Sequence, residues 1–264
     1  MPENKEVTFQ SGYADLKDLK MYYEIHGEGK TPLVLIHGGG STIETSFGII
    51  LPLFAKDRKV IAMELDAHGR TNDRPGPSSF EQDADDVGAL LQQLKIDSAD
   101  ILGFSNGGNT AMQLAIRHPA VVRKLVVVSS FYKREGMMPG FFDFMKSASL
   151  ENMPKQLQEA YLEVAPDKTK LQVMHDKDKN RMLNFKDWSD DVLQSIKKPT
   201  LFMVADHDVM TVEHVTAMSH LVKESELMVI PGVHGSFIGE VVTSDKKSKM
   251  IELTAVAVEE FLDK

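Results

Sequence analysis

Three stretches of this sequence are apolar at every position, namely LVLI (33–36), LVVV (125–128) and LFMV (201–204). A strand with one solvated face alternates polar and apolar residues, because successive side chains point to opposite sides. Continuous apolar runs instead indicate strands that are buried on both faces, as in a parallel sheet covered by helices. These runs therefore restrict the chain to a fold that has such a sheet at its centre.

The rest of the chain alternates strand and helix signals around these runs. Strands are expected at 19–23, 33–36, 59–63, 99–102, 125–128, 200–204 and 227–230. Apolar residues at helical spacing predict helices at 80–94, 110–118, 212–222 and 249–261. Strands that alternate with helices predict the α/β class, with a parallel sheet flanked by helices on both faces.

One interval, residues 131–198, carries helical signals at 153–164 and 190–196 but no strand. An excursion of this length between two core strands is better explained by an inserted helical cap than by a loop. We therefore expect a core formed by residues 1–130 and 199–264, with residues 131–198 as a cap or lid. Within the cap, the charged segment HDKDK (175–179) is expected to be a solvated loop.

Charge and composition exclude several classes of partner. The formal net charge is −9, and without a basic stripe this argues against binding to nucleic acid. The chain has no cysteine, so disulfides and a cysteine nucleophile are excluded. The N-terminal MPENKEVTF has no apolar signal core, and no stretch approaches the roughly 20 apolar residues of a membrane helix. A cytoplasmic protein without membrane contact is expected, although a signal peptide that had been removed would leave no trace.

The segment GFSNG (103–107) follows the strand expected at 99–102 and precedes a helix. It fits the pattern G-x-S-x-G, in which a strained strand-to-helix turn projects the serine side chain. Glycines on either side of such a turn avoid the clash that a Cβ would cause. Ser105 is therefore the candidate nucleophile.

A serine nucleophile needs a base, and the base needs an acid to orient it. His234 lies in PGVHGSF (231–237), directly after the last expected strand, at the sheet edge where sites of open α/β sheets assemble. His68 remains a minor rival, whereas His26, His175, His214 and His220 are expected at the surface. For the acid, we favour Asp208 over Asp206, because Asp208 lies further along the loop after the strand 200–204.

The run HGGG (37–40) follows the strand 33–36 and brings bare backbone close to the same edge. It lacks the lysine of a P-loop and the spacing of G-x-G-x-x-G, so a phosphate cradle is not favoured. We expect the N–H groups of Gly39 and Asn106 to form an oxyanion hole. No metal-ligand cluster at zinc spacing is evident, and neither a metal nor a cofactor is expected.

The motifs LVLIHGGG (33–40), GFSNGGNT (103–110), PTLFMVADHD (199–208) and PGVHGSF (231–237) together resemble the α/β-hydrolase fold superfamily over nearly the whole chain. The resemblance implies a mostly parallel, eight-stranded sheet, a lid between the sixth and seventh core strands, and a triad of Ser105, Asp208 and His234. The chain departs from the family pattern at Ala205, where glycine is usual. It departs again in ELDAHGRT (64–71), where Asp66 and His68 are expected to be non-catalytic.

Within this superfamily, a serine at the elbow implies a serine esterase or lactonase. The head region around MYYEIHG (21–27) resembles that of macrolide esterases, which implies a large lactone such as a macrolide as one substrate. Carbon–carbon bond hydrolases, perhydrolases of the haloperoxidase type, cyanohydrin lyases and ligand-binding receptors with little turnover are the alternatives. The expected partner is a small ester or lactone, and the protein is expected to be a monomer or a homodimer. The residues expected to line the substrate pocket are Gly40, Phe131, Met138, Phe141, Phe142 and Trp188.

Overall fold

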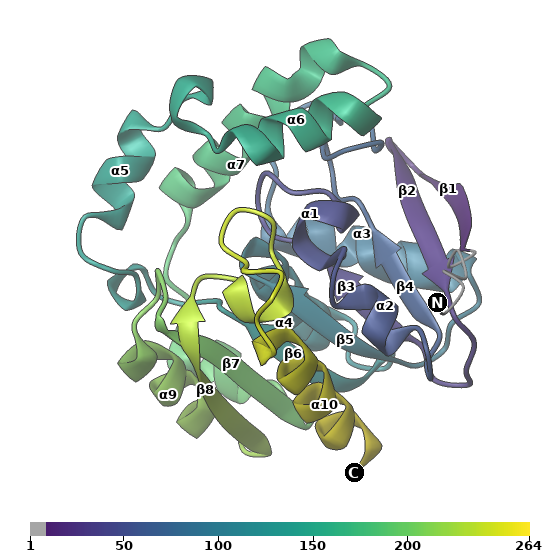
Figure 1. Ribbon diagram of the computed structural model, residues 1–264, viewed down its shortest axis with the longest axis vertical. Coiled ribbons are helices and arrows are strands. Elements are labelled where there is room, and N and C mark those ends of the chain that lie inside the picture. The colour runs from purple at the N-terminus through teal and green to yellow at the C-terminus, as the bar shows by residue number, and fades with distance from the viewer. Residues whose placement is uncertain (1–8) are drawn as a thin grey trace.

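The computed structural model describes residues 9–264 and contains an eight-stranded sheet in the order β1-β2-β4-β3-β5-β6-β7-β8 (Figure 1). Strands β3 to β8 run parallel to one another, whereas β1 and β2 are antiparallel to their neighbours. The strands are β1 (Gln10–Leu16), β2 (Leu19–His26), β3 (Leu33–Ile36), β4 (Val60–Met63), β5 (Ala99–Phe104), β6 (Val122–Val128), β7 (Thr200–His207) and β8 (Ser225–Val233). The α/β-hydrolase architecture expected from the sequence is confirmed.

Strand β1 is the element of the sheet for which the sequence predicted no segment. Its residues QSGYADL are largely exposed and bury only Ala14 and Leu16. It occupies the end of the sheet and pairs with β2 alone, so it needs no continuous apolar run. Burial on both faces is instead complete in β3, β4 and β5.

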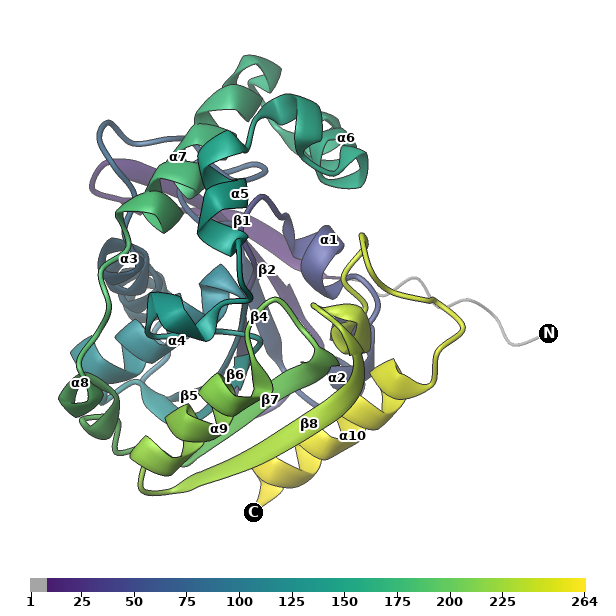
Figure 2. The ribbon, with the colours of Figure 1, turned by 90° about the vertical axis from the view of Figure 1, so that its left-hand side faces the viewer.

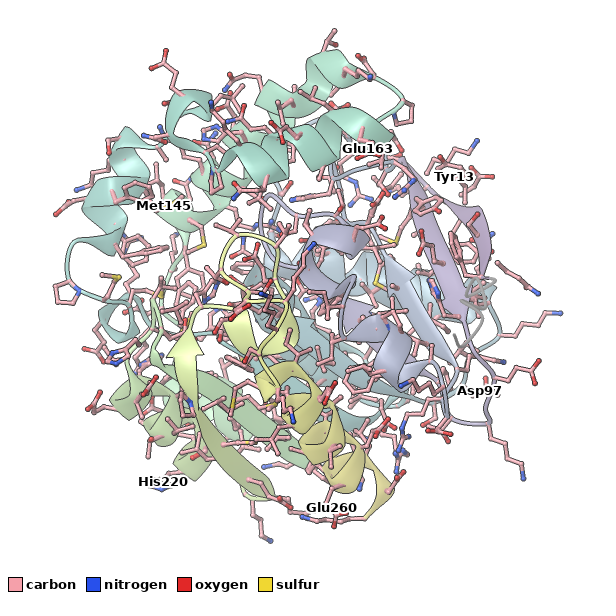
Figure 3. All side chains as sticks on the ribbon, in the orientation of Figure 1. Tyr13, Asp97, Met145, Glu163, His220 and Glu260 are labelled. Atoms are coloured by element: carbon pink, nitrogen blue, oxygen red, sulfur yellow. The ribbon has the colours of Figure 1, made fainter. Side chains whose placement is uncertain are left out.

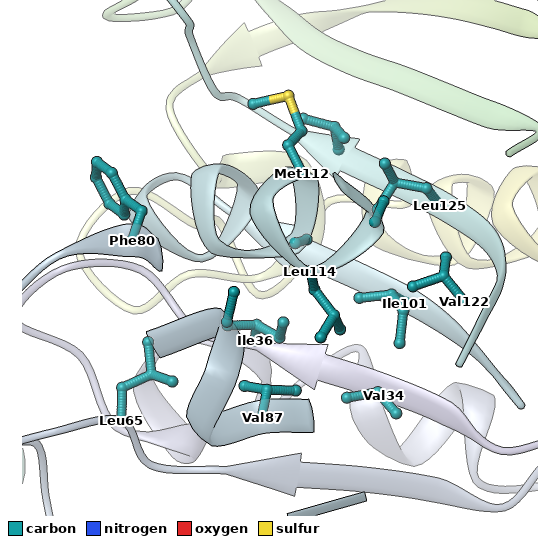
Figure 4. Close-up of a cluster of buried hydrophobic side chains, with 14 of the residues drawn as sticks. Val34, Ile36, Leu65, Phe80, Val87, Ile101, Met112, Leu114, Val122 and Leu125 are labelled. Carbon is teal, nitrogen blue, oxygen red and sulfur yellow. The ribbon is translucent and has the colours of Figure 1, made fainter. Parts of the chain in front are cut away.

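Helices cover both faces of the sheet, and each face has its own apolar core. One core joins the sheet to α3, α4 and α9, and Figure 4 shows part of it, including Val34, Val87 and Leu114. The other core joins it to α1, α2 and α10 through residues such as Phe47, Phe54 and Val258. The bounds of these helices are α1 (Ile43–Phe47), α2 (Leu51–Phe54), α3 (Phe80–Gln93), α4 (Asn106–Arg117), α9 (Val212–Leu221) and α10 (Met250–Asp263).

The segment between β6 and β7 forms helices and no strand within the described residues. Figures 1 and 2 show α5, α6 and α7 together at one end of the molecule, toward which the arrow of β8 points. This places α5, α6 and α7 over the carboxyl ends of the parallel strands, whereas α8 lies beside α9 (Figure 2). Its elements are η1 (Arg134–Gly136), α5 (Phe141–Ser147), η2 (Leu150–Asn152), α6 (Lys155–Val164), η3 (Lys168–Lys170), α7 (Leu171–Asn184) and α8 (Asp190–Gln194). A further short helix, η4 (Ser236–Ile238), follows β8.

Helix α7 corrects the expectation that residues 175–179 form a solvated loop. Met174, Asp178 and Met182 recur every four residues along α7, and all three are buried. A charged residue within an otherwise apolar helical stripe is therefore turned toward the protein interior.

Candidate active site

Ser105 occupies a tight turn between β5 and α4. Its backbone angles are φ 54° and ψ −121°, a conformation that an L-residue adopts only at a cost. The turn brings β5 and α4 so close that a Cβ on Gly103 would lie 2.1 Å from the carbonyl oxygen of Gly107. Helix α4 begins at Asn106, immediately after the serine, rather than at residue 110 as expected.

The structure brings Ser105, His234 and Asp208 into one hydrogen-bonded series. The Nε2 atom of His234 lies 3.1 Å from Ser105 Oγ, and its Nδ1 atom lies 2.6 Å from Asp208 Oδ1. The imidazole ring also packs against Phe104, with the ring centroids 4.9 Å apart. Because Nδ1–H donates to the carboxylate, Nε2 is left as the acceptor for the serine hydroxyl.

The Asp208 carboxylate is buried and receives several donors. Ser129 Oγ donates to Oδ2 across 2.5 Å, and the backbone N–H groups of Ala205 and Val209 donate to Oδ2 and Oδ1. Burial alone would raise the pKa of Asp208, but the hydrogen bond from His234 and the charge of His234 lower it by more, so the pKa lies below its ordinary value. Asp206, the alternative acid, is exposed and accepts from the backbone N–H of Gly232 instead.

Gly39 and Asn106, the two residues expected to supply the oxyanion donors, line the same cavity as Ser105. The side-chain amide of Asn106 covers Gly39 so closely that a Cβ there would lie 2.5 Å from Asn106 Nδ2. Neither backbone N–H has a protein acceptor within residues 9–264. Two free donors beside a nucleophile are the arrangement that stabilises an oxyanion.

Four buried ionisable residues form a cluster next to the glycine-rich loop 37–40. Asp178 of α7 accepts a hydrogen bond from Gly40 N–H at 2.6 Å, and its Oδ2 lies 2.9 Å from His68 Nε2. Its other oxygen accepts from Arg181, which also donates to Asp83 of α3. The sequence reasoning missed Asp178, Arg181 and Asp83, although Asp178 shares the apolar stripe of α7.

A cavity of about 280 Å³ lies between the cap segment and the carboxyl ends of the strands. It opens onto Ser105 and His234, and its walls are mostly apolar. Met145 of α5, labelled in Figure 3, belongs to its cap side. The other apolar side chains that line it are Phe131, Met137, Phe141, Phe144, Ala148, Met153, Pro154, Leu157, Met174, Met182, Val209 and Met210.

Gly40, Phe131 and Phe141 line this cavity as expected from the sequence, whereas three other predicted residues do not. Met138 is 46% exposed, because residues 137 and 138 pair with residues 209 and 210, which follow β7, and successive side chains of an extended segment point to opposite sides. Phe142 lies on the next helical position after Phe141 and stacks on Arg134. Trp188 packs against Phe185, outside the cavity.

Two histidines that were expected at the surface are buried. His26 contacts Glu24 at 2.8 Å, and His214 of α9 accepts from the backbone N–H of Tyr132 at 3.3 Å. Burial lowers the pKa of His214 to about 4, helped by the charge of Lys133. Neither histidine lies in the cavity that contains Ser105.

Residues 9–264 contain no group of three or more His, Asp or Glu side chains arranged to hold a metal ion. None of the helices in that range combines the length and the apolar character that crossing a bilayer requires.

Comparison with known protein families places the fold in context. The family model described as "alpha/beta hydrolase fold" matches residues 31–179, which is more than half of the chain. This protein belongs to the α/β-hydrolase fold family.

Three relatives illustrate this membership. The chain is 39% identical over 103 residues to the 2-hydroxymuconate semialdehyde hydrolase of Pseudomonas sp. strain CF600, which covers 38% of this chain and 36% of the relative. It is 34% identical over 113 residues to the human serine hydrolase BPHL, covering 41% and 39% of the two chains. Est816, described as an N-acyl homoserine lactone degrading enzyme, superposes with a TM-score of 0.70 at 27% identity, covering 92% of this chain and 98% of Est816.

The first curated relatives are matched over 30–56% of their own length. The similarity therefore establishes the family and the fold of this protein.

Proposed function

We propose that this protein is a serine hydrolase that cleaves a carboxylic ester or lactone through an acyl-enzyme intermediate. The observation that carries the proposal is the series Ser105–His234–Asp208, with contacts of 3.1 and 2.6 Å, beside two unpaired backbone donors. Nucleophile, base, orienting acid and oxyanion donors are the parts that acyl transfer requires.

In the first half of the proposed reaction, Ser105 Oγ attacks the substrate carbonyl carbon while its proton passes to His234 Nε2. The carbonyl oxygen becomes an oxyanion and accepts hydrogen bonds from the N–H groups of Gly39 and Asn106. Asp208 holds the imidazole and stabilises the imidazolium that forms. The bond to the alcohol oxygen then breaks, and that oxygen takes the proton from His234.

In the second half, a water molecule gives a proton to His234 Nε2 and attacks the acyl carbon. The bond between that carbon and Ser105 Oγ breaks, and the serine oxygen recovers the proton from His234. The products are the free acid and the regenerated site. Loss of one oxyanion donor typically removes about 2.7–4 kcal/mol of transition-state stabilisation in such reactions.

The lining of the cavity supports an apolar substrate portion. Methionine is flexible and fits irregular apolar ligands, and six methionines line the walls beside three phenylalanines. Esters and lactones with an apolar acyl part therefore fit best.

The proposal is tested with p-nitrophenyl esters of graded acyl length, using wild type and Ser105→Ala in parallel. We expect turnover by the wild type, with loss of at least 10³-fold in the variant. Labelling by a fluorophosphonate, located by mass spectrometry, should modify Ser105 in the wild type. Full ester turnover by Ser105→Ala would show that the assignment is wrong.

A second candidate is a carbon–carbon bond hydrolase, favoured by the 39% identity to 2-hydroxymuconate semialdehyde hydrolase. Such an enzyme would use the same site on a carbonyl compound. It predicts fluorophosphonate labelling of Ser105 without turnover of simple esters, and hydrolysis of 2-hydroxymuconate semialdehyde itself. Measuring both substrates on one preparation separates the two candidates.

A further inference from the structure

Asp178 belongs to α7 of the cap segment but contacts the core at the loop that follows β3. Its Oδ2 atom accepts from Gly40 N–H across 2.6 Å. A Cβ built on the preceding Gly39 would lie 3.1 Å from the same oxygen. The carboxylate therefore sits against the peptide units that present one of the two proposed oxyanion donors.

The buried charge of Asp178 is balanced by two cationic partners. His68 Nδ1 faces the carbonyl oxygen of Asp66 at 2.8 Å, while Nε2 faces Asp178 at 2.9 Å. With an acceptor at each nitrogen, the protonated ring is favoured. Burial lowers the pKa of His68, but the charge of Asp178 outweighs it and the net pKa is raised. Arg181 neutralises the other oxygen of Asp178 and extends the contact to Asp83 on α3.

Gly40 has a left-handed backbone, with φ at +68°. L side chains rarely adopt this angle, so the turn that follows Gly39 depends on a glycine at position 40. His68 Nε2 lies 3.3 Å from Gly40 N, but the nitrogen of a protonated ring cannot accept, so Asp178 is the acceptor that the described residues provide for Gly40 N–H. A core loop is thus fixed by a side chain from the cap.

On the basis of the proposed serine hydrolase function, we propose that Asp178 is a positioning residue that aligns the Gly39 oxyanion donor by holding Gly40 and His68. Both of its oxygens are already engaged by Gly40, His68 and Arg181, so it acts through the loop and not on the substrate. Misplacement of a catalytic donor by about 1 Å can reduce turnover on the order of 10²-fold. The cap segment would then supply part of the catalytic geometry in addition to enclosing the substrate.

The test is Asp178→Asn, which keeps the shape of the side chain but removes its charge. We expect kcat for a p-nitrophenyl ester to fall about 10- to 100-fold, with KM within about twofold. The affinity for a trifluoromethyl ketone, which forms a tetrahedral oxyanion on the serine, should fall by a similar factor. A role limited to stability would move neither value in the folded variant. His68→Gln provides a second variant with a smaller expected loss, of about three- to tenfold.

The matched control is Glu163→Gln, an exposed carboxylate on α6 that does not line the cavity. It should leave kcat, KM and inhibitor affinity unchanged, and circular dichroism should show every variant folded. Unchanged kcat and inhibitor affinity in both Asp178→Asn and His68→Gln would overturn the inference, as would a change confined to KM. A wild type that neither turns over esters nor reacts with a fluorophosphonate would contradict the proposed function and the inference with it.

Discussion

Ser129 donates a hydrogen bond of 2.5 Å to Asp208, the carboxylate that contacts His234. Ser129 lies at the carboxyl end of β6 and Asp208 just beyond β7, so neighbouring parallel strands bring the two residues together. The bond leaves Asp208 Oδ1 to face the imidazole. Ser129 therefore helps to orient the acid, together with the backbone N–H groups of Ala205 and Val209.

Ser129→Ala should reduce kcat about three- to tenfold, because the carboxylate loses a donor and its pKa rises toward the ordinary value. Hydrogen bonds to charged groups contribute about 1.5–3 kcal/mol, so the free energy of unfolding should fall by a similar amount. The neighbouring Ser130→Ala is the control, because Ser130 is also buried but donates to Asn109. Equal kcat values in the two variants would argue against this role of Ser129.

The choice between the two aspartates after β7 can be made by a matched pair of variants. Asp208→Asn should lower kcat by about 10⁴-fold, as expected when the triad imidazole loses its orienting charge. Asp206→Asn should stay within about threefold of wild type, because that side chain accepts a backbone N–H from an exposed position. Steady-state ester kinetics check both, and the reverse order of effects would reassign the acid to Asp206.

Adjacent phenylalanines provide a test of the cavity. Phe141 lines it, whereas Phe142 stacks on Arg134. Phe141→Ala should shift the preferred acyl chain of p-nitrophenyl esters by about two or more carbons toward longer chains, because the wall recedes. Phe142→Ala should leave the optimum in place. The profile of kcat/KM against chain length is the measurement, and a shift in Phe142→Ala alone would place the acyl chain elsewhere.

His214 makes the stability of the fold sensitive to acid. In the folded protein burial lowers its pKa to about 4, below the ordinary 6.5, so the unfolded chain binds the proton more readily. The folded state therefore keeps its full stability above pH 6.5, and it loses stability through His214 as the pH falls from 6.5 toward about 4. At about 1.4 kcal/mol per pH unit, wild type should lose about 2 kcal/mol more than His214→Gln between pH 7.5 and 5.

Urea denaturation at the two pH values measures this difference. His220→Gln on the same helix is the control, because His220 is exposed and its replacement should reproduce the wild-type loss. An identical pH dependence in His214→Gln and wild type would contradict the prediction.

The central strands could be predicted from the sequence because strands that are buried on both faces consist almost entirely of apolar residues. The runs at 33–36 and 125–128 are apolar throughout and lie within β3 and β6. Strand β1 was not predicted, because it lies at the edge of the sheet, buries only Ala14 and Leu16, and contains no run of apolar residues. A strand can be predicted when its own residues indicate burial. A strand that forms mainly because it pairs with a neighbouring strand cannot.

The same distinction applies to the site. Ser105, Asp208 and His234 each follow a strand, and because parallel strands end at one edge of the sheet, the sequence alone predicts that the three lie close together. The contact between Asp178 and His68 joins residues 110 positions apart, on a cap helix and a core loop. Likewise, which of Met137 and Met138 lines the cavity depends on the direction in which each side chain points. Two adjacent methionines give no sign of this direction in the sequence.

The backbone of Ser105, with φ at 54°, has a further consequence for how such a chain can evolve. Side chains other than glycine are strained there by about 1–3 kcal/mol, so Ser105→Gly should unfold at a higher temperature than Ser105→Ala while both are inactive. Calorimetry of the two variants would reveal the difference, and equal melting temperatures would show the turn to be unstrained. Selection for heat resistance alone would therefore discard the nucleophile, and only selection for turnover retains it.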